Sequence, residues 1–118
     1  MKIIIPMKLD NWNDIINSNR TNKFIGASRK KKEMKDISYF IRSMPKIEKY
    51  PIKIKFIWHV KNQRKDLDNM SVKSILDCMQ NLGKLENDNI THINEIIHTT
   101  IKDKEEFVEV EIENNDST

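Results

Sequence analysis

The stretch IKIKFIWHV, Ile52–Val60, decides the fold. Apolar residues occupy every second position from Ile52 to Trp58, and Lys53 and Lys55 lie between them. Successive side chains of a strand point to opposite faces of a sheet, so this alternation predicts a strand with one buried face and one basic face. Such a strand needs neighbours, and the segments on either side of it supply them.

Downstream of this strand, the apolar stripe of residues 69–82 predicts a helix that Gly83 ends. Residues 93–102 and 107–112 predict two further strands, joined as a hairpin through residues 103–106.

Upstream, residues 2–5 predict a short strand that ends at Pro6. Residues 9–17 and 28–44 predict two helices, with a loop at 18–26 between them. The whole order predicts an α+β fold, in which a small mixed β-sheet packs with about three helices.

A length of 118 residues fits one compact domain. We expect a single domain over residues 1–112 and a disordered tail over residues 113–118. No apolar run is long enough to cross a membrane, and no stretch resembles a signal peptide. Cys78 is the single cysteine, which excludes an intrachain disulfide and a multi-cysteine zinc site. We therefore expect a cytoplasmic protein with no membrane partner.

The charge is divided unevenly along the chain. Residues 1–65 hold 17 Lys and Arg against 5 Asp and Glu, whereas residues 66–118 hold 4 Lys against 13 Asp and Glu. This asymmetry fits a polyanionic partner for the basic part and a cation site in the acidic part. It fits equally well a fold in which the two halves interleave and their charges pair at the surface.

Asp66 and Asp68 are the leading candidates for chemistry. In an extended segment two side chains at i and i+2 point the same way, so both carboxylates would face one site. Mg²⁺ prefers oxygen ligands of this kind, together with water and substrate phosphate. The alternative interpretation is a solvated turn in which Asp68 or Asn69 caps the following helix.

Three residues further along extend the pattern. Lys73 and Asp77 lie four apart on one helix face, either as a surface ion pair or as a cation at the edge of the carboxylate cluster. Asp88 follows the helix end, where the chain turns back and could return it toward Asp66 and Asp68.

A set of cations is expected to contact DNA phosphates, although a solubilising surface is the alternative. It comprises Arg20, Lys23, Arg29, Lys30, Lys31, Lys32, Arg64 and Lys65.

The combined pattern resembles the RusA-like Holliday junction resolvases, most closely their phage-type members. The matching pieces are KDLDN at 65–69, KSILD at 73–77, Gly83 and the Asn87–Asp88 pair. A looser likeness upstream includes Ile5–Pro6, residues 13–17, Arg20, Lys23, Gly26–Ala27 and Lys31–Lys32. Two departures are an extra residue between Asp68 and Lys73, and Asn87 in place of an aspartate.

The resemblance implies a RusA-like fold and specific roles. Asp66, Asp68 and Asp88 fall on the family's three catalytic, metal-binding aspartates, Lys73 on its catalytic lysine, and Asp77 on a helix acid near the site. Family members act as homodimers that nick two opposing strands of a four-way DNA junction in recombination and repair. A two-fold dimer suits this substrate, because the junction is itself approximately two-fold symmetric.

The expected activity is therefore that of an endodeoxyribonuclease that hydrolyses phosphodiesters with Mg²⁺, or with Mn²⁺ in its place. The metal would lower the pKa of an attacking water, and Lys73 would stabilise charge in the transition state. Asp77 would orient Lys73 or a water. Two alternatives remain: a non-catalytic protein that binds branched DNA, and an inactive phage protein that binds a partner.

Overall fold

The computed structural model describes residues 1–7, 23–61 and 72–116, with the backbone alone for residues 23–30. In chain order its elements are β1 (Lys2–Ile5), α2 (Lys23–Ile41), β2 (Ile52–Val60), α3 (Val72–Asn81), β3 (Ile93–Lys102) and β4 (Phe107–Asn114). The predicted α+β class with a small mixed sheet is confirmed. The described part of the chain holds two helices, fewer than expected, and the helix predicted at 9–17 lies outside it.

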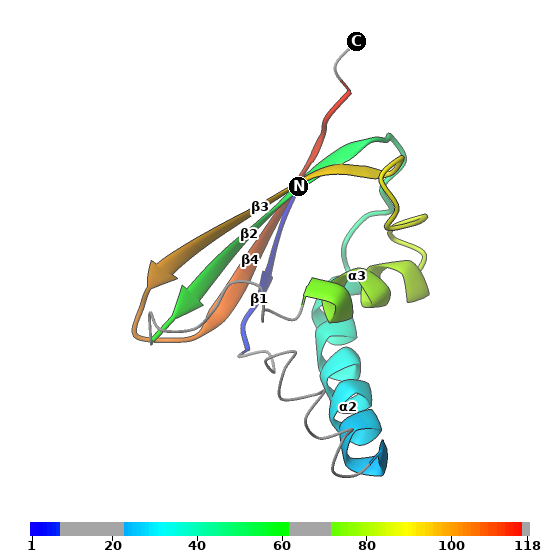
Figure 1. The fold of residues 1–118 in the computed structure, drawn as a ribbon. Helices are drawn as coiled ribbons and strands as arrows, with labels where there is room; N and C mark the ends of the chain where they lie inside the picture. The colour runs from blue at the N-terminus through cyan, green and yellow to red at the C-terminus, as the bar shows by residue number, and fades with distance from the viewer. Residues whose placement is uncertain (8–22, 62–71, 117–118) are drawn as a thin grey trace.

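The strands lie in the order β1-β4-β2-β3 (Figure 1). β2 pairs in parallel with β3 and antiparallel with β4, and β4 also pairs antiparallel with β1. The predicted hairpin of β3 and β4 is therefore wrong, because β2 lies between these two strands. The short connection at 103–106 crosses over the end of β2, and Asp103 N donates to Val60 O at 2.9 Å there.

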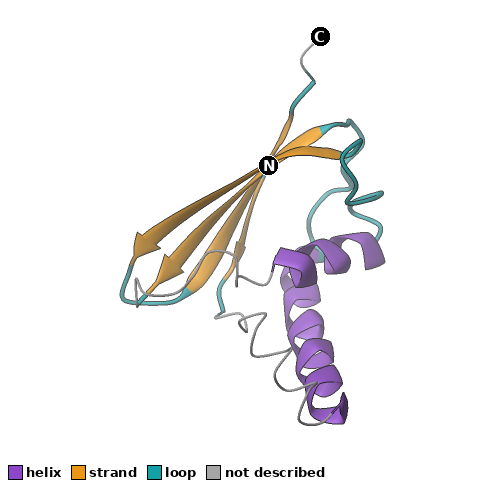
Figure 2. Cartoon of the chain, viewed as in Figure 1, coloured by secondary structure: helices purple, strands orange, loops and turns teal. Residues whose placement is uncertain are grey.

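The core lies between one face of the sheet and the helices, which both lie on the same side of it (Figure 2). β2 alternates between fully buried and half-buried positions along its whole length, as its sequence predicts. Its core face contributes Ile54 and Phe56, α2 contributes Ile37 and α3 contributes Ile75, and all four are fully buried. Each Å² of apolar surface that is removed from water stabilises the folded state by about 25 cal/mol, so the burial of such side chains is the main contribution to stability.

The bounds of α2 differ from the prediction at both ends. The helix begins at Lys23 rather than Ser28, so residues 23–26 are helical and not part of a loop. Gly26 lies inside it, at a cost of about 1 kcal/mol that a 19-residue helix tolerates. The helix ends at Ile41, and Met44 N donates to Ile41 O in a tighter turn. Pro45 accounts for the early end, because a proline disfavours helical backbone in the residue before it.

The sheet places basic strands next to an acidic one. β4 carries glutamates on its outer face and lies between β1 and β2, which carry lysines. Lys2 Nζ lies 3.1 Å from Glu109, and Lys53 Nζ lies 3.4 Å from Glu113. Lys2 and Lys53 belong to the basic part of the sequence and their partners to the acidic part, so for these two lysines the charges of the two parts pair at the surface. Surface pairs of this kind contribute about 0–1 kcal/mol each.

β4 continues to Asn114, two residues beyond its predicted end and into the segment expected to be a disordered tail. Asn115 N also donates to Pro51 O at 2.8 Å, and Asn115 Nδ2 donates to Asn94 Oδ1 at 2.7 Å. In the described parts of the chain, no helix combines the length and the apolar character that crossing a membrane requires.

Candidate functional site

The candidate residues belong to one parallel crossover, β2–α3–β3. β2 ends at Val60, α3 begins at Val72, and β3 begins at Ile93 beside Ile52 at the opposite end of the sheet. Arg64, Lys65, Asp66 and Asp68 come between β2 and α3 in sequence and lie outside the described residues. The described part of the candidate site therefore consists of α3 and the loop that follows it.

α3 presents one charged face and one buried face. Ser74, Ile75, Leu76, Cys78 and Met79 are buried, and α3 packs against α2. Lys73 is exposed in the first turn, and Asp77 is half-buried one turn later on the same side. Cys78 is buried and donates to Met34 O at 3.2 Å across the two helices. Because its other face is fixed by packing, α3 is a rigid support for Lys73.

Gly83 reverses the chain directly after α3. Its φ of 70° is the left-handed conformation that glycine adopts most readily at a helix end. Lys84 N and Leu85 N then both donate to Met79 O, at 2.8 and 3.1 Å. Leu85 is 1% exposed and anchors the returning chain in the core. The predicted helix stop is confirmed, and Asp88 follows in the loop that leads from α3 to β3.

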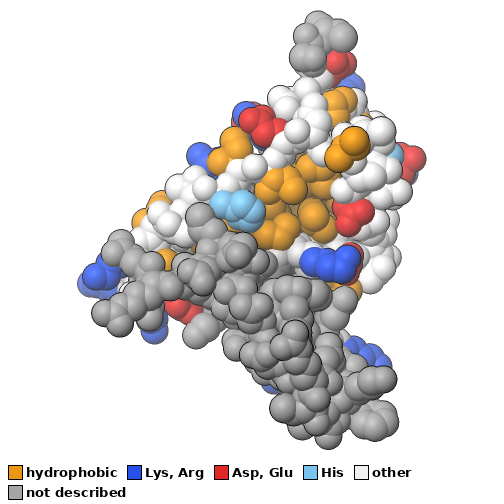
Figure 3. All heavy atoms as spheres, in the orientation of Figure 1, with side chains coloured by type: hydrophobic (Ala, Val, Ile, Leu, Met, Phe, Trp, Pro, Cys, Tyr) orange, Lys and Arg blue, Asp and Glu red, His pale blue; other side chains and the backbone are white. Residues whose placement is uncertain are grey.

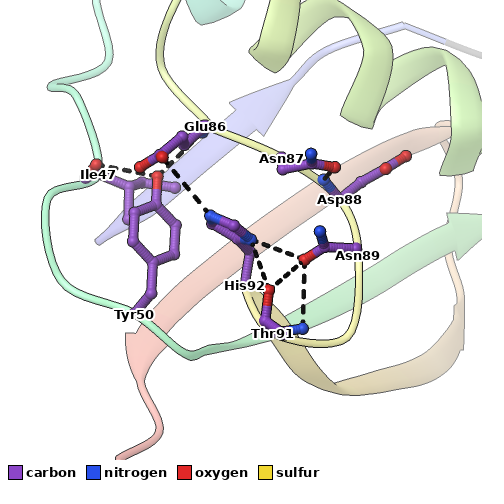
Figure 4. A network of polar contacts seen from close by, with 8 residues as sticks. All are labelled: Ile47, Tyr50, Glu86, Asn87, Asp88, Asn89, Thr91 and His92. Carbon is purple, nitrogen blue, oxygen red and sulfur yellow. Dashed lines mark hydrogen bonds and ion pairs between the residues drawn. The ribbon is translucent and has the colours of Figure 1, made fainter.

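The loop that carries Asp88 is fixed by hydrogen bonds to Asn89 (Figure 4). Asn89 Oδ1 lies 2.6 Å from Thr91 Oγ1 and 2.7 Å from His92 Nδ1. Asn89 O accepts from the backbone N–H groups of His92 and Ile93 at 3.0 and 2.9 Å. These contacts form a compact turn just before β3, so the backbone around Asp88 has a defined course.

Tyr50 joins this loop to the segment that precedes β2. Its hydroxyl donates to Ile47 O at 3.0 Å and accepts from Glu86 N at 3.0 Å. Its ring contacts the His92 ring edge to face, with centroids 4.8 Å apart (Figure 4). The sequence gives no sign of this role for Tyr50 or His92, because Glu86 and His92 are 36 and 42 positions away from Tyr50. The structure adds both as residues that position the Asp88 loop.

The Asp88 carboxylate is exposed and points away from the Asn89 cluster (Figure 4). Asp88 N donates to Asn87 Oδ1 at 2.7 Å. Among the described residues no hydrogen bond or ion pair occupies the carboxylate oxygens, and no group of three His, Cys, Asp or Glu side chains that could hold a metal is present there. An oxygen donor of this kind fits Mg²⁺ as one ligand of a larger set.

Glu86 and Glu95 are two further acids in this part of the chain, and both have other contacts. Glu86 Oε1 lies 3.8 Å from His92 Nε2, and Glu95 Oε2 accepts from Asn115 Nδ2 at 3.4 Å.

The basic candidates cluster on the first half of α2. Lys31 and Lys32 are exposed, and Lys23, Arg29 and Lys30 precede them on the same helix. Arg20 lies outside the described residues. Figure 3 shows basic and acidic side chains at the border of a central apolar area. The helix therefore carries a dense row of cations, whereas the strand lysines pair with glutamates.

His59, on the outer face of β2, has a carboxylate at each ring nitrogen. Its Nδ1 lies 2.9 Å from Asp103 Oδ2, its Nε2 lies 3.2 Å from Glu109 Oε2, and its ring stacks on Phe107. The hydrogen bond from His59 lowers the pKa of Asp103, and His59 followed by Lys2 lowers the pKa of Glu109.

His98 accepts a hydrogen bond from Trp58 Nε1 at 3.0 Å through Nδ1. Burial lowers the pKa of His98, which is consistent with an unprotonated Nδ1. Structural roles therefore account for both histidines.

No protein-family model matches the chain, and a search of curated proteins finds no significant match. The functional argument thus depends on the residues themselves and on their placement in the fold.

Proposed function

We propose that this protein is an Mg²⁺-dependent endodeoxyribonuclease of the RusA-like type that resolves four-way DNA junctions as a homodimer. The observation that carries the proposal is that the described part of the motif lies on α3 and in the loop that follows it. α3 presents Lys73 and Asp77 on one side, Gly83 ends the helix before Asp88, and Asp66 and Asp68 precede α3 in sequence.

The length of α3 is compatible with one shared site. Its ten residues span about 15 Å at 1.5 Å per residue. Leu85 N donates to Met79 O near the end of α3, and the three residues from Leu85 to Asp88 can extend about 10 Å. We propose that Asp88 and Lys73 face one shared site, which Asp66 and Asp68 would complete.

The roles follow from chemistry. Asp66, Asp68 and Asp88 would hold Mg²⁺, which when bound polarises the scissile phosphate and lowers the pKa of an attacking water. Lys73 would place its ammonium near the phosphate and stabilise the negative charge that develops there. Asp77 would orient Lys73, since the two lie one helical turn apart. Tyr50 and His92 would keep Asp88 in position through the loop.

The cations on α2 would hold the DNA backbone. Lys31 and Lys32 are exposed, and phosphate contacts of this kind are independent of sequence and weaken as salt rises. Such contacts position a duplex arm without reading its bases.

The proposal is tested by cleavage of a labelled synthetic four-way junction, with a linear duplex of the same sequence as the control substrate. We expect paired nicks in the junction that require Mg²⁺ or Mn²⁺. Asp88→Asn should lower the cleavage rate by at least about 100-fold while junction binding persists, because the substitution removes one metal ligand but no phosphate contact. Asp66→Asn and Asp68→Asn should behave in the same way.

Glu86→Gln is the matched control, because it removes an exposed carboxylate from the same loop. Equal activity of Asp88→Asn and Glu86→Gln would exclude Asp88 as a ligand. Tight binding of the junction by the native chain, with no cleavage in either metal, would refute the nuclease and leave a non-catalytic protein that binds branched DNA.

A second measurement tests the shared site without activity. Mn²⁺ bound by the three aspartates should broaden the amide NMR signals of Asp88 and Lys73 together, and Asp68→Asn should weaken both effects. Broadening at Asp88 alone would contradict a site that includes the beginning of α3.

A further inference from the structure

A groove lies between the open edge of β1 and the C-terminal end of α2. Its volume is about 570 Å³, and its lining consists of residues 1–4 from the strand side and residues 39, 40 and 42–45 from the helix side. It belongs to neither the crossover nor the first half of α2, so the proposed nuclease site does not account for it.

The strand side of the groove carries backbone groups that point outward. Met1 and Ile112 exchange two hydrogen bonds, Met1 N to Ile112 O at 3.1 Å and Ile112 N to Met1 O at 2.8 Å. Such pairs alternate along an antiparallel ladder, so the N–H and C=O of Lys2 and Ile4 point away from β4. In the described sheet β1 is an edge strand, with β4 on one side and no strand on the other. A chain in extended conformation can therefore pair with Lys2 and Ile4.

The side chains around the groove are apolar and cationic. Tyr39 is 61% exposed and Met1 is 46% exposed, which places two of the exposed large apolar residues on this rim. The Arg42 guanidinium lies over the Tyr39 ring, 4.6 Å from its centroid. Lys2 is the other charged residue of the lining, and the lining contains no acid. An acidic segment with apolar side chains would complement this surface.

A peptide fits these features better than a nucleic acid does. An edge strand offers alternating donors and acceptors, which match a peptide backbone and not a phosphate backbone. Lys2 Nζ already lies 3.1 Å from Glu109, so Arg42 is the main cation available.

We propose that this groove binds an acidic, extended peptide segment of a partner protein, which adds to β1 as a further strand and places a carboxylate on Arg42. The backbone pairs with Lys2 and Ile4 supply affinity, and the aromatic side chains of Tyr39 and Phe40 in the lining select the side chains that enter. This interaction is independent of DNA cleavage.

The test uses ¹⁵N-labelled protein and a capped peptide of about eight residues that alternates valine and glutamate. We expect the amide signals of Lys2, Ile4 and Arg42 to shift on titration. Ile4→Pro should abolish binding: it removes an outward-pointing N–H and leaves the bonds to β4 intact, as edge strands allow. Arg42→Ala should weaken binding about tenfold, the equivalent of one charge-assisted hydrogen bond. Lys46→Ala is the matched control, since Lys46 is an exposed cation outside the groove lining.

Four outcomes would overturn the proposal. One is the absence of shifts at Lys2 and Ile4 at millimolar peptide, and another is equal binding of a valine–lysine peptide. The third is a response of the same amides to an oligothymidylate of about eight nucleotides but not to the peptide, which would assign the groove to single-stranded nucleic acid. Sedimentation is run in parallel, because a dimer that Ile4→Pro dissociates would assign the β1 edge to a second copy of this chain.

Discussion

Replacing Tyr50 by phenylalanine removes one oxygen atom and two hydrogen bonds from the molecule. The lost contacts are the 3.0 Å bond to Ile47 O and the 3.0 Å bond from Glu86 N. A protein hydrogen bond contributes a net of about 0.5–1.5 kcal/mol. Water can reach Glu86 N, which places that bond near the lower limit, so we expect a loss of about 1–2 kcal/mol in the free energy of unfolding. For a domain near this size that corresponds to a fall in Tm of about 4–10 °C.

The assay is thermal and urea unfolding followed by circular dichroism, together with hydrogen exchange of the Glu86 amide. Tyr39→Phe is the matched control, because Tyr39 is 61% exposed and its hydroxyl has no hydrogen bond in the described structure. If Tyr50→Phe and Tyr39→Phe unfold at the same temperature and Glu86 exchanges at its native rate, Tyr50 does not hold the Asp88 loop.

Two further predictions concern stability. Gly83→Ala should lower the free energy of unfolding by about 1 kcal/mol through backbone strain alone, since φ is 70° and no atom lies within 4 Å of the added Cβ. Gly83→Asn should cost less, and urea unfolding that ranks the two variants in reverse would contradict this explanation. In the second prediction, His59→Gln removes the hydrogen bonds that lower the pKa of Asp103 and Glu109. These carboxylates stabilise the fold above the ordinary carboxyl range and lose that effect as the pH falls through their lowered pKa values. The difference in free energy of unfolding between the native chain and His59→Gln should therefore be largest near pH 6 and shrink below about pH 4. A difference that does not change with pH would refute this role of His59.

The sequence predicted the elements of the fold better than their pairing. The alternation in β2 and the glycine after α3 are local signals, and the structure confirms both. The partner of a strand is a non-local property. β3 and β4 are separated by four residues, a spacing typical of a hairpin, yet β3 pairs in parallel with β2 across the helical crossover. Nothing in the local sequence distinguishes these two arrangements.

The candidate site was predictable to a similar extent. The spacing of Lys73 and Asp77 on one helix face, and the position of Asp88 after a helix stop, could be derived from periodicity and capping rules. The contact of Tyr50 with the Asp88 loop could not be derived in this way, because Tyr50 reaches the loop from a segment that precedes β2. The strand lysines were ambiguous for the same reason, since their glutamate partners lie on a strand about 60–110 residues further along.

The position of β4 also has a consequence for how the chain folds. β4 follows the other strands in sequence but lies between β1 and β2. In the pairing of β1 with β4, Lys2 lies opposite Glu111, near the other end of the chain. Until residues 107–114 are in place, β1 has no neighbour in the sheet, and β2 can pair only with β3. Joining such distant segments requires a large loss of chain entropy before any contact is gained, so the domain should fold on a timescale of about milliseconds to seconds. On the ribosome the sheet cannot close before synthesis passes residue 114, and the apolar face of β2 depends on the two helices for protection until then.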